Sequence, residues 1–311
     1  MSMHLFGAVV TAHGVAANNR GETEGNLTTL QKILWNGDVY TTVSAEAIRW
    51  AIRAAWQRQG LAVNRQWDED LRRHAWQDPD FEQAAEPFID DDVLGFMSAQ
   101  AARAEAEEEA EQVATRGRGR ARGRALVRRS RLEVTRAISL TPWPGDVVFS
   151  VASVGATPSA STKGAFPVPY SAEVHATRYQ YGFALTPGAL IKPERALDVV
   201  DAIVGLGDVA GNHARFYFDF APDTIVFRWT ADFAPRLLYP FVVGADGSLT
   251  VPELVRRVEA GDIQAHELII GGSLAQTRDG AWLKEAGAKV HAGVKQAAEE
   301  VKDVLRQVIA P

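Results

Sequence analysis

The sequence contains no cysteine among its 311 residues. Disulfide bonds and thiolate-ligated metal sites are therefore excluded, which suits a reducing compartment, and we expect a cytoplasmic location. Residues 1–15 lack a basic first segment and a long apolar core, so they do not match a signal peptide. No uncharged apolar run approaches the roughly 20 residues that a membrane helix needs, and we expect no membrane partner.

The motifs of common enzyme classes are also missing. The seven histidines form no His-x-x-x-His or His-Glu-x-x-His pair, which argues against a zinc hydrolase. There is no Gly-x-Ser-x-Gly elbow, Walker loop or dinucleotide-binding fingerprint. His13 lies in a polar loop with Glu22 and Glu24, so general acid–base cleavage of RNA is an alternative to an ordinary surface histidine. We expect no catalytic residue, no metal and no cofactor.

What is present indicates a globular protein with an uneven distribution of charge. Hydrophobic residues make up 46% of the sequence and aromatic residues 9%. The order of strand-like and helix-like segments, interrupted by long insertions, predicts an α+β fold. The formal net charge is −6, which by itself argues against a nucleic-acid partner. Nine arginines nevertheless fall between positions 116 and 136.

Five of these arginines alternate with glycine and alanine, at Arg116, Arg118, Arg120, Arg122 and Arg124. Such a segment cannot bury apolar surface, and its field attracts phosphate groups of DNA or RNA. The preceding residues 99–115 are rich in alanine and glutamate and are predicted to form an acidic helix. Charge pairing within the chain is therefore the alternative to phosphate binding.

A polar loop, a strand and a helix are predicted between positions 13 and 58. Asn36-Gly37-Asp38 predicts a turn, and the β-branched and aromatic residues 39–43 predict a short strand. Ser44 is a suitable N-cap for a helix that ends near Gly60. The apolar stripe of this helix consists of Ile48, Ala51, Ile52 and Ala55.

Arg49 and Arg53 share a neighbouring face of that helix because they are four residues apart. Two guanidiniums beside a polar loop could hold a phosphate chain, whereas the alternative is a solvated helix face. Asp90, Asp91 and Asp92 could suggest a metal site, but adjacent carboxylates point in different directions, and we expect a solvated turn.

The rest of the chain predicts alternating strands and helices. Strands are expected at 5–11, 225–229, 237–243 and 268–272, helices at 192–204, 251–260 and 286–309, and an irregular or helical insertion at 64–92. Phe216, Phe218 and Phe220 alternate along a predicted strand, where they form either core or an RNA-stacking platform. Gly271 and Gly272 end another strand, and they either touch RNA or make the bend.

Several of these segments together resemble a known family. Asn-x-Arg-Gly-Glu-x-x-Gly at 18–25 and Val-Ser-x-x-x-Ile-Arg-x-x-Ile-Arg at 43–53 are similar to the N-terminal region of the CRISPR-associated DevR family. Further similar blocks occur, in order, at 92–97, 129–146 and 211–222. The resemblance covers most of the chain and is weakest at 60–125 and in the C-terminal tail.

The resemblance implies a modified RNA-recognition (ferredoxin-like) palm with finger and thumb insertions. The expected division is a palm at 1–60 plus 172–285, a finger-like insertion at 61–128, a thumb-like arm at 140–171 and a C-terminal helix at 286–311. Members of this family form the backbone of type I Cascade complexes, and subtype I-B is expected here. Type III relatives cut RNA with an aspartate on the first loop, where this sequence has Asn18 and Asn19.

The function implied is binding of crRNA without catalysis. The expected partners are crRNA, target DNA through the guide, further copies of the chain arranged head-to-tail, other Cascade subunits and a helicase–nuclease. The RNA-binding residues implied are Asn19, Arg20, Asn26, Ser44, Arg49, Arg53, Arg128, Arg129, Arg131, Gly271 and Gly272. A variant with both Arg49→Ala and Arg53→Ala is expected to fold and to lose its RNA.

Two other functions remain open at this stage. One is an RNA-cleaving enzyme on the same fold, which metal-dependent cleavage of a complementary target would reveal. The other is a transcriptional autoregulator, which would have to bind promoter duplex without a guide.

Overall fold

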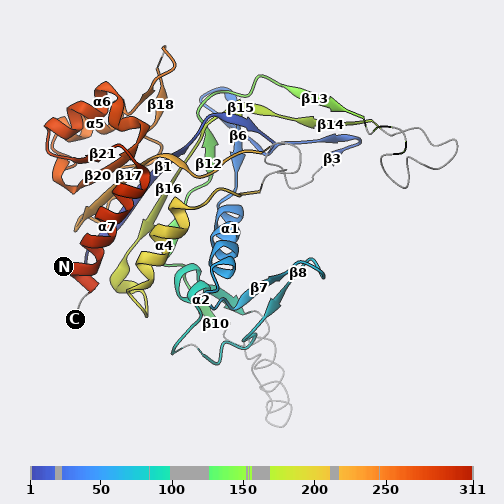
Figure 1. Cartoon of the computed structure of the whole chain (residues 1–311), viewed down its shortest axis with the longest axis horizontal. Coiled ribbons are helices and arrows are strands. Elements are labelled where there is room, and N and C mark those ends of the chain that lie inside the picture. The colour runs from blue at the N-terminus through green and yellow to red at the C-terminus, as the bar shows by residue number, and fades with distance from the viewer. Residues whose placement is uncertain are drawn as a thin grey trace, which may run out of the picture.

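The computed structural model describes residues 2–17, 23–83, 85–98, 126–151, 153, 155, 169–210, 217–244 and 246–309. It confirms a mixed α/β protein, in which helices cover both faces of one large sheet (Figure 1). Among the described residues, no helix is long and apolar enough to cross a membrane.

The central strand of the large sheet is β1 (His4–Thr11), which pairs antiparallel with both β16 (Tyr179–Leu185) and β17 (Pro222–Thr230). Beyond β17 the sheet continues with β20 (Leu268–Gly272) and β21 (Lys289–His291). Beyond β16 it continues with β12 (Ala137–Ser139), β6 (Asp38–Val43) and β5 (Lys32–Trp35), while β11 (Leu132–Val134) also pairs with β16. The strands predicted at 5–11, 39–43, 225–229 and 268–272 are confirmed.

The two faces of this sheet carry separate cores, because successive residues of a strand point to opposite sides. Leu5 and Val9 of β1 pack with α1 (Ala45–Arg58), α4 (Arg195–Val204) and α7 (Val294–Ile309). Phe6, Ala8 and Val10 pack on the other face with α5 (Pro252–Glu259) and α6 (Arg278–Glu285).

Helix α1 follows the sequence prediction closely. The Ser44 hydroxyl accepts a hydrogen bond from the backbone N–H of Ala47 at 3.2 Å and so caps the helix. The predicted apolar stripe is buried, and Gly60 lies after the helix with φ +79°.

Beyond α1 lies a segment that we call the α2 insertion, residues 61–98 and 126–131. It contains helix α2 (Ile89–Leu94) and also an antiparallel hairpin of β7 (Arg65–Asp68) and β8 (Arg73–Trp76), where an irregular or helical insertion was expected. Strands β9 (Phe96–Ser98) and β10 (Leu126–Arg128) then pair with each other. The predicted acidic helix and the arginine–glycine segment follow β9 and lie outside the described residues.

A second projecting part, which we call the arm sheet, extends away from the body near the start of α1 (Figure 1). Its strand order is β13 (Val147–Ser150), β14 (Tyr170–Glu173), β4 (Leu27–Thr28) and β3 (Thr23–Glu24). The arm sheet therefore joins the N-terminal polar segment to residues more than 100 positions later. At its root, β2 (Gly14–Ala16) pairs with β15 (His175–Thr177).

Three predictions of secondary structure are wrong in part. Of the strand expected at 237–243, only β18 (Val242–Val243) is a strand, paired with β19 (Leu249–Thr250). Residues 217–220 form no strand, although Phe218 and Phe220 are buried and confirm the core interpretation; Phe216 is outside the described residues. The C-terminal helix begins at Val294 and not at 286, because residues 289–291 pair in parallel with β20.

Candidate nucleic-acid interface

Three consecutive aspartates of α2 form the polar centre of the α2 insertion. Asp90, Asp91 and Asp92 are 0%, 2% and 0% exposed, so the expected solvated turn is wrong. Ile89 and Val93 on either side of them pack in the main core and draw the carboxylates inward. Buried carboxylates need partners, because an unpaired charge away from water is strongly unfavourable.

Asp90 joins α2 to α1. Its Oδ2 accepts a hydrogen bond from Nε of Arg53 at 3.0 Å, and its Oδ1 accepts one from the backbone N–H of Asn64 at 2.7 Å. Arg53 is only 8% exposed. Its visible role is therefore to hold α2 against α1, and contact of Arg53 with RNA stays a prediction.

Asp92 joins α2 to the start of α4 and to β10. It accepts hydrogen bonds from Nη1 of Arg195 at 2.8 Å, from Nη2 of Arg128, and from the backbone N–H groups of Ile191 and Lys192. Burial opposes the charged form of Asp92, but these hydrogen bonds outweigh that effect and hold its pKa below the ordinary value. Arg128 is thus engaged mainly within the protein.

Two further arginines lie at the C-terminal end of α2, where backbone carbonyls have no partner within the helix. Nη2 of Arg49 donates to the carbonyl of Leu94, and Nη2 of Arg65 donates to that of Gly95 at 3.2 Å. Among the described residues neither guanidinium forms a salt bridge, although the carboxylates of Glu46 and Asp91 attract Arg49 and Arg65, respectively. This end of α2 therefore gathers two guanidiniums whose charge no direct ion pair neutralises.

The positive charge of Arg65 affects the two arginines of α1. Burial lowers the pKa of Arg49 and of Arg53, and repulsion by Arg65 lowers both further. The guanidinium carbon of Arg65 lies 4.8 Å from the centroid of the Trp76 ring, which holds it in place. A bound anion would relieve the repulsion between these arginines. Arg65 was not among the predicted residues, because nothing in its spacing marks it as a neighbour of Arg49.

Three further arginines flank strand β11. The side chain of Arg129 is 80% exposed and pairs with Glu133 at 2.6 Å, while Arg131 is half-buried. Exposed Arg136 donates to Oγ1 of Thr42 at 3.2 Å. These three guanidiniums are reachable by a phosphate chain without breaking a buried ion pair.

The structure does not bring the remaining predicted residues of the N-terminal region together. Asn26 is exposed on the arm sheet, where its carbonyl accepts from the backbone N–H of Ser171 at 3.0 Å. Ser44 is buried as the α1 cap, whereas Asn26 lies in the turn between β3 and β4 of the arm sheet. A single surface containing Asn26, Ser44, Arg49 and Arg53 is therefore not seen.

A buried network of neutral groups lies at the root of the arm sheet, in addition to the ion pair of Glu173 in β14 with Lys32 in β5. Oγ1 of Thr41 lies 2.7 Å from Nδ1 of His175 and 2.9 Å from the hydroxyl of Tyr179, while Nε2 of His175 lies 3.3 Å from Oγ1 of Thr141. Burial lowers the pKa of His175 to about 4, so the imidazole is neutral at pH 7. We call this set the arm-root network.

Gly271 and Gly272 are explained by packing within the chain. A Cβ at Gly271 would lie 2.6 Å from that of Ala297 on α7. Gly272 has φ +105°, and a Cβ there would meet the backbone carbonyl oxygen of Asp223. Both glycines are buried. Contact of these glycines with RNA stays a prediction that the geometry does not favour.

Seven predicted site residues lie outside the described residues, so the structure does not place them: Asn19, Arg20, Arg116, Arg118, Arg120, Arg122 and Arg124. Within the described part of the chain, no group of three or more His, Asp or Glu side chains is arranged to hold a metal ion.

The fold is similar to that of chains in two solved RNA-guided complexes. A chain of a solved "CRISPR RNA-guided surveillance complex, pre-nicking" matches with a TM-score of 0.58 at 13% identity, covering 97% of this chain and 100% of that one. A chain of another "CRISPR RNA-guided surveillance complex" matches with a TM-score of 0.56 at 15% identity, covering 97% and 99%. At such low identity, these matches show the fold alone.

Sequence comparison gives the family. The family model described as "CRISPR-associated negative auto-regulator DevR/Csa2" matches residues 7–202. The "CRISPR-associated protein Cas7/Cst2/DevR" of Myxococcus xanthus (strain DK1622) is 50% identical over 302 residues, which cover 94% of this chain and 95% of that protein. The chain belongs to the CRISPR-associated Cas7/DevR family, as its sequence motifs suggested.

Proposed function

We propose that the protein is a crRNA-binding backbone subunit of a type I CRISPR surveillance complex, with subtype I-B as the expected form. The observation that carries this proposal is the 50% identity to a Cas7/Cst2/DevR protein along nearly the whole length of both chains. The match of the fold, over its full length, to chains of RNA-guided surveillance complexes supports it. Copies would polymerise head-to-tail along the guide and hold its backbone and shape, leaving sequence recognition to base pairing with target DNA.

In this proposal the large sheet and its helices are the RNA-recognition-like palm, the α2 insertion is the finger and the arm sheet is the thumb. The boundaries are those expected from the sequence, except that the C-terminal helix starts at Val294. The arm sheet suits contact with another copy, because Val147 and Phe149 of β13 and Val151 directly after it are all exposed.

The guide would be held chiefly by cations that are accessible. Arg129, Arg131 and Arg136 offer guanidiniums along one edge of the sheet, and Asn26 offers an exposed amide on the arm sheet. Arg49, with Arg65 beside it, would accept a phosphate at the end of α2. Asn19, Arg20 and the five arginines between 116 and 124 remain proposed contacts to the guide or the DNA.

We further propose that the subunit is not an enzyme. This rests on membership of a family of backbone subunits, together with Asn18 and Asn19 at the positions where cutting relatives carry an aspartate. Cleavage of DNA would then depend on a separate helicase–nuclease that joins the other Cascade subunits.

The test is purification of the full-length protein from cells that also express a CRISPR array and its processing enzyme. Co-purified RNA of repeat–spacer sequence within curved or helical particles is the expected result, measured by absorbance ratio, RNA sequencing and electron microscopy. A nucleic-acid-free monomer would contradict the proposal.

The family model's description favours one alternative, an auto-regulator of transcription. Binding to a promoter duplex without guide RNA would support that alternative.

Incubating the RNA-loaded particle with a complementary RNA and Mg²⁺ tests the nuclease alternative, for which cleavage of the target would be the positive result.

A further inference from the structure

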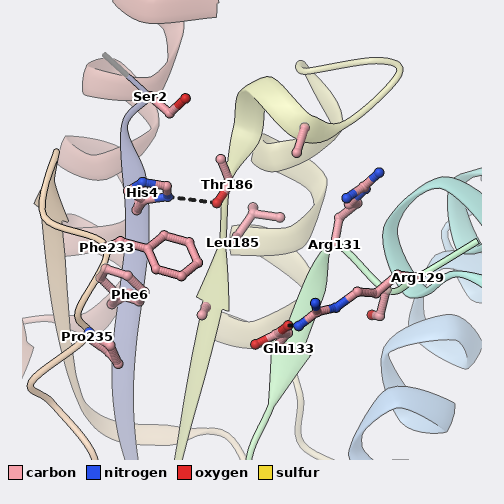
Figure 2. A pocket seen from close by; sticks show the side chains of 13 residues that line it. Ser2, His4, Phe6, Arg129, Arg131, Glu133, Leu185, Thr186, Phe233 and Pro235 are labelled. Carbon is pink, nitrogen blue, oxygen red and sulfur yellow. Dashed lines mark hydrogen bonds and ion pairs between the residues drawn. The ribbon is translucent and has the colours of Figure 1, made fainter.

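A pocket of about 410 Å³ opens in the large sheet where β1 begins and β16 ends, and the proposed function assigns a role only to Arg129 and Arg131 of the residues that line it. Its volume lies within the roughly 300–1,000 Å³ range of small-ligand sites. Figure 2 shows Phe233 on one side and the side chains of Arg129, Arg131 and Glu133 on the other. The end of β16 lies between the two sides.

The hollow follows from the sheet register and from one small side chain. Glu133, Ala184 and Phe6 are neighbours across three strands and therefore point to the same face. Ala184 is the smallest of the three and leaves open space over β16. On this face, α5 and α6 cover the part of the sheet nearer β20. They leave the surface over Ala184 and Glu133 accessible.

The aromatic wall is exposed but held in position. Phe233 is 77% exposed, which is unusual for so large an apolar side chain. The ring of His4 lies 5.0 Å from it, edge to face, and Nδ1 of His4 is in turn 2.8 Å from Oγ1 of Thr186. One face of the Phe233 ring is therefore open to solvent, while the contact with His4 keeps the ring in position.

The opposite wall offers hydrogen-bonding groups that can change partner. The ion pair between Arg129 and Glu133 is exposed on both sides, so little free energy is lost when it opens. It then supplies guanidinium donors and a carboxylate acceptor. Nε of Arg131 is buried without a hydrogen-bond partner among the described residues, so no bond at that nitrogen fixes its side chain.

We propose that this pocket binds one unstacked base of a single-stranded nucleic acid, stacked on Phe233 and hydrogen-bonded at its edge by Arg129 and Glu133. An exposed aromatic face next to paired donors and acceptors is the chemistry by which proteins take up splayed-out bases. The proposal rests on the proposed function. The base comes either from the guide RNA or from a strand of the bound DNA.

Photo-crosslinking of the full-length, guide-loaded protein tests the proposal and separates the two sources. In one arm the guide RNA carries 5-iodouracil, and in the other arm the target or displaced DNA strand carries it. After irradiation and digestion, mass spectrometry is expected to find nucleotide attached to the peptide that contains Phe233 in one of the two arms. That arm identifies the source.

Matched variants sharpen the test. Phe233→Ala is expected to abolish the crosslink and to weaken binding of the strand identified by about tenfold, since stacking on an aromatic residue supplies an effect of that size. Phe233→Trp keeps a stacking surface and should retain affinity, whereas Phe233→Leu should behave like alanine. Ala184→Met fills the hollow and should block the crosslink while Phe233 remains in place.

Normal guide loading with no crosslink in either arm would overturn the pocket proposal and leave the proposed function standing. If Phe233→Ala leaves strand affinity unchanged but breaks up the particles, the pocket is a contact for protein and the proposal is likewise wrong. If the wild-type protein takes up no guide, the proposed function fails. Binding of a single-stranded 5-iodouracil DNA to the free protein, unchanged by Phe233→Ala, would then overturn the pocket proposal as well.

Discussion

The two projecting parts of the molecule are fixed to its body by different chemistry. The α2 insertion is held by buried charges, with Asp90 and Asp92 bonded to Arg53, Arg128 and Arg195. The arm sheet is held at its root chiefly by neutral groups, with Thr41 between His175 and Tyr179, together with the ion pair of Glu173 with Lys32. Both junctions are buried and connect segments far apart in the sequence.

The difference determines how each junction responds to change. Removing one member of a buried ion pair leaves an uncompensated charge, which is far less favourable than an unsatisfied hydroxyl. The two junctions also respond to pH in opposite directions, because burial raises the pKa of Asp91 and lowers that of His175. The insertion should therefore be the more rigidly specified part, and the arm sheet the more tolerant.

The strongest test of this comparison is Asp92→Ala. The substitution leaves Arg128 and Arg195 facing each other with no carboxylate between them. We expect a loss of about 3–5 kcal/mol in the free energy of unfolding, measured by urea denaturation. Asp303→Ala is the matched control, because Asp303 is exposed in its pair with Arg306, and it should change stability by under about 1 kcal/mol. Similar losses for the two variants would break the comparison.

The sequence predicted much of the fold but not this junction. The N-cap at Ser44 and the apolar stripe of α1 are local signals, and both are confirmed. The partners of Asp92 lie 36 and 103 residues away, so a run of three aspartates resembled a solvated turn. Strand β21 was missed because it is only three residues long and depends on pairing with β20.

The candidate site could be predicted less well than the fold. Spacing placed Arg49 and Arg53 on one helix face, but only the fold shows that Arg53 is buried against Asp90. The expectation that Arg49→Ala with Arg53→Ala folds normally should therefore fail, because Asp90 would lose its guanidinium partner. Arg65 carried no sequence signal, since its proximity to Arg49 arises from the packing of the β7–β8 hairpin.

The next largest effect should come from Asp91→Asn, and it should depend on pH. Burial, followed by repulsion from Asp90, raises the pKa of Asp91 from 3.8 to about 6. The folded protein thus binds this proton more tightly than the unfolded chain, and the wild type loses stability as pH rises through about 6. Asparagine carries no charge, so the variant should be more stable by up to about 3 kcal/mol at pH 8. The difference should vanish near pH 4, and a gap that is constant with pH would contradict the assignment.

A smaller effect is expected for Thr41→Val in the arm-root network. Valine keeps the shape of threonine but removes the hydroxyl that bonds to His175 and Tyr179. Neutral partners left unsatisfied should lower stability by about 1–2 kcal/mol in urea denaturation. Thr23→Val at an exposed position of the arm sheet is the control and should be nearly neutral. A loss as large as that of Asp92→Ala would remove the distinction between the junctions.

Protonation of His175 in the unfolded chain should lower the stability of the folded protein at acidic pH. Because its pKa falls from 6.5 to about 4 on burial, only the unfolded chain gains this proton between those values. The stability that His175 contributes is complete above pH 6.5 and is lost as pH falls toward 4. A His175→Gln variant should show a smaller decline over that window than the wild type, as measured by thermal unfolding at each pH. An equal decline in both proteins would assign the acid sensitivity elsewhere.

The smallest effect on stability should be that of Arg129→Ala, although its effect on RNA should be clear. Arg129 is exposed and its ion pair with Glu133 is screened by water, so unfolding should change by less than about 0.5 kcal/mol. If it contacts a phosphate of the guide, the variant should release RNA at lower salt than the wild type, and the dependence of binding on salt should become less steep. Arg53→Ala should show the reverse pattern, with reduced stability and, per folded molecule, little change in salt dependence. Comparing the two variants therefore separates an arginine that stabilises the fold from one that contacts RNA. If RNA binding by Arg129→Ala depended on salt as it does in the wild type, contact of Arg129 with a phosphate would be excluded.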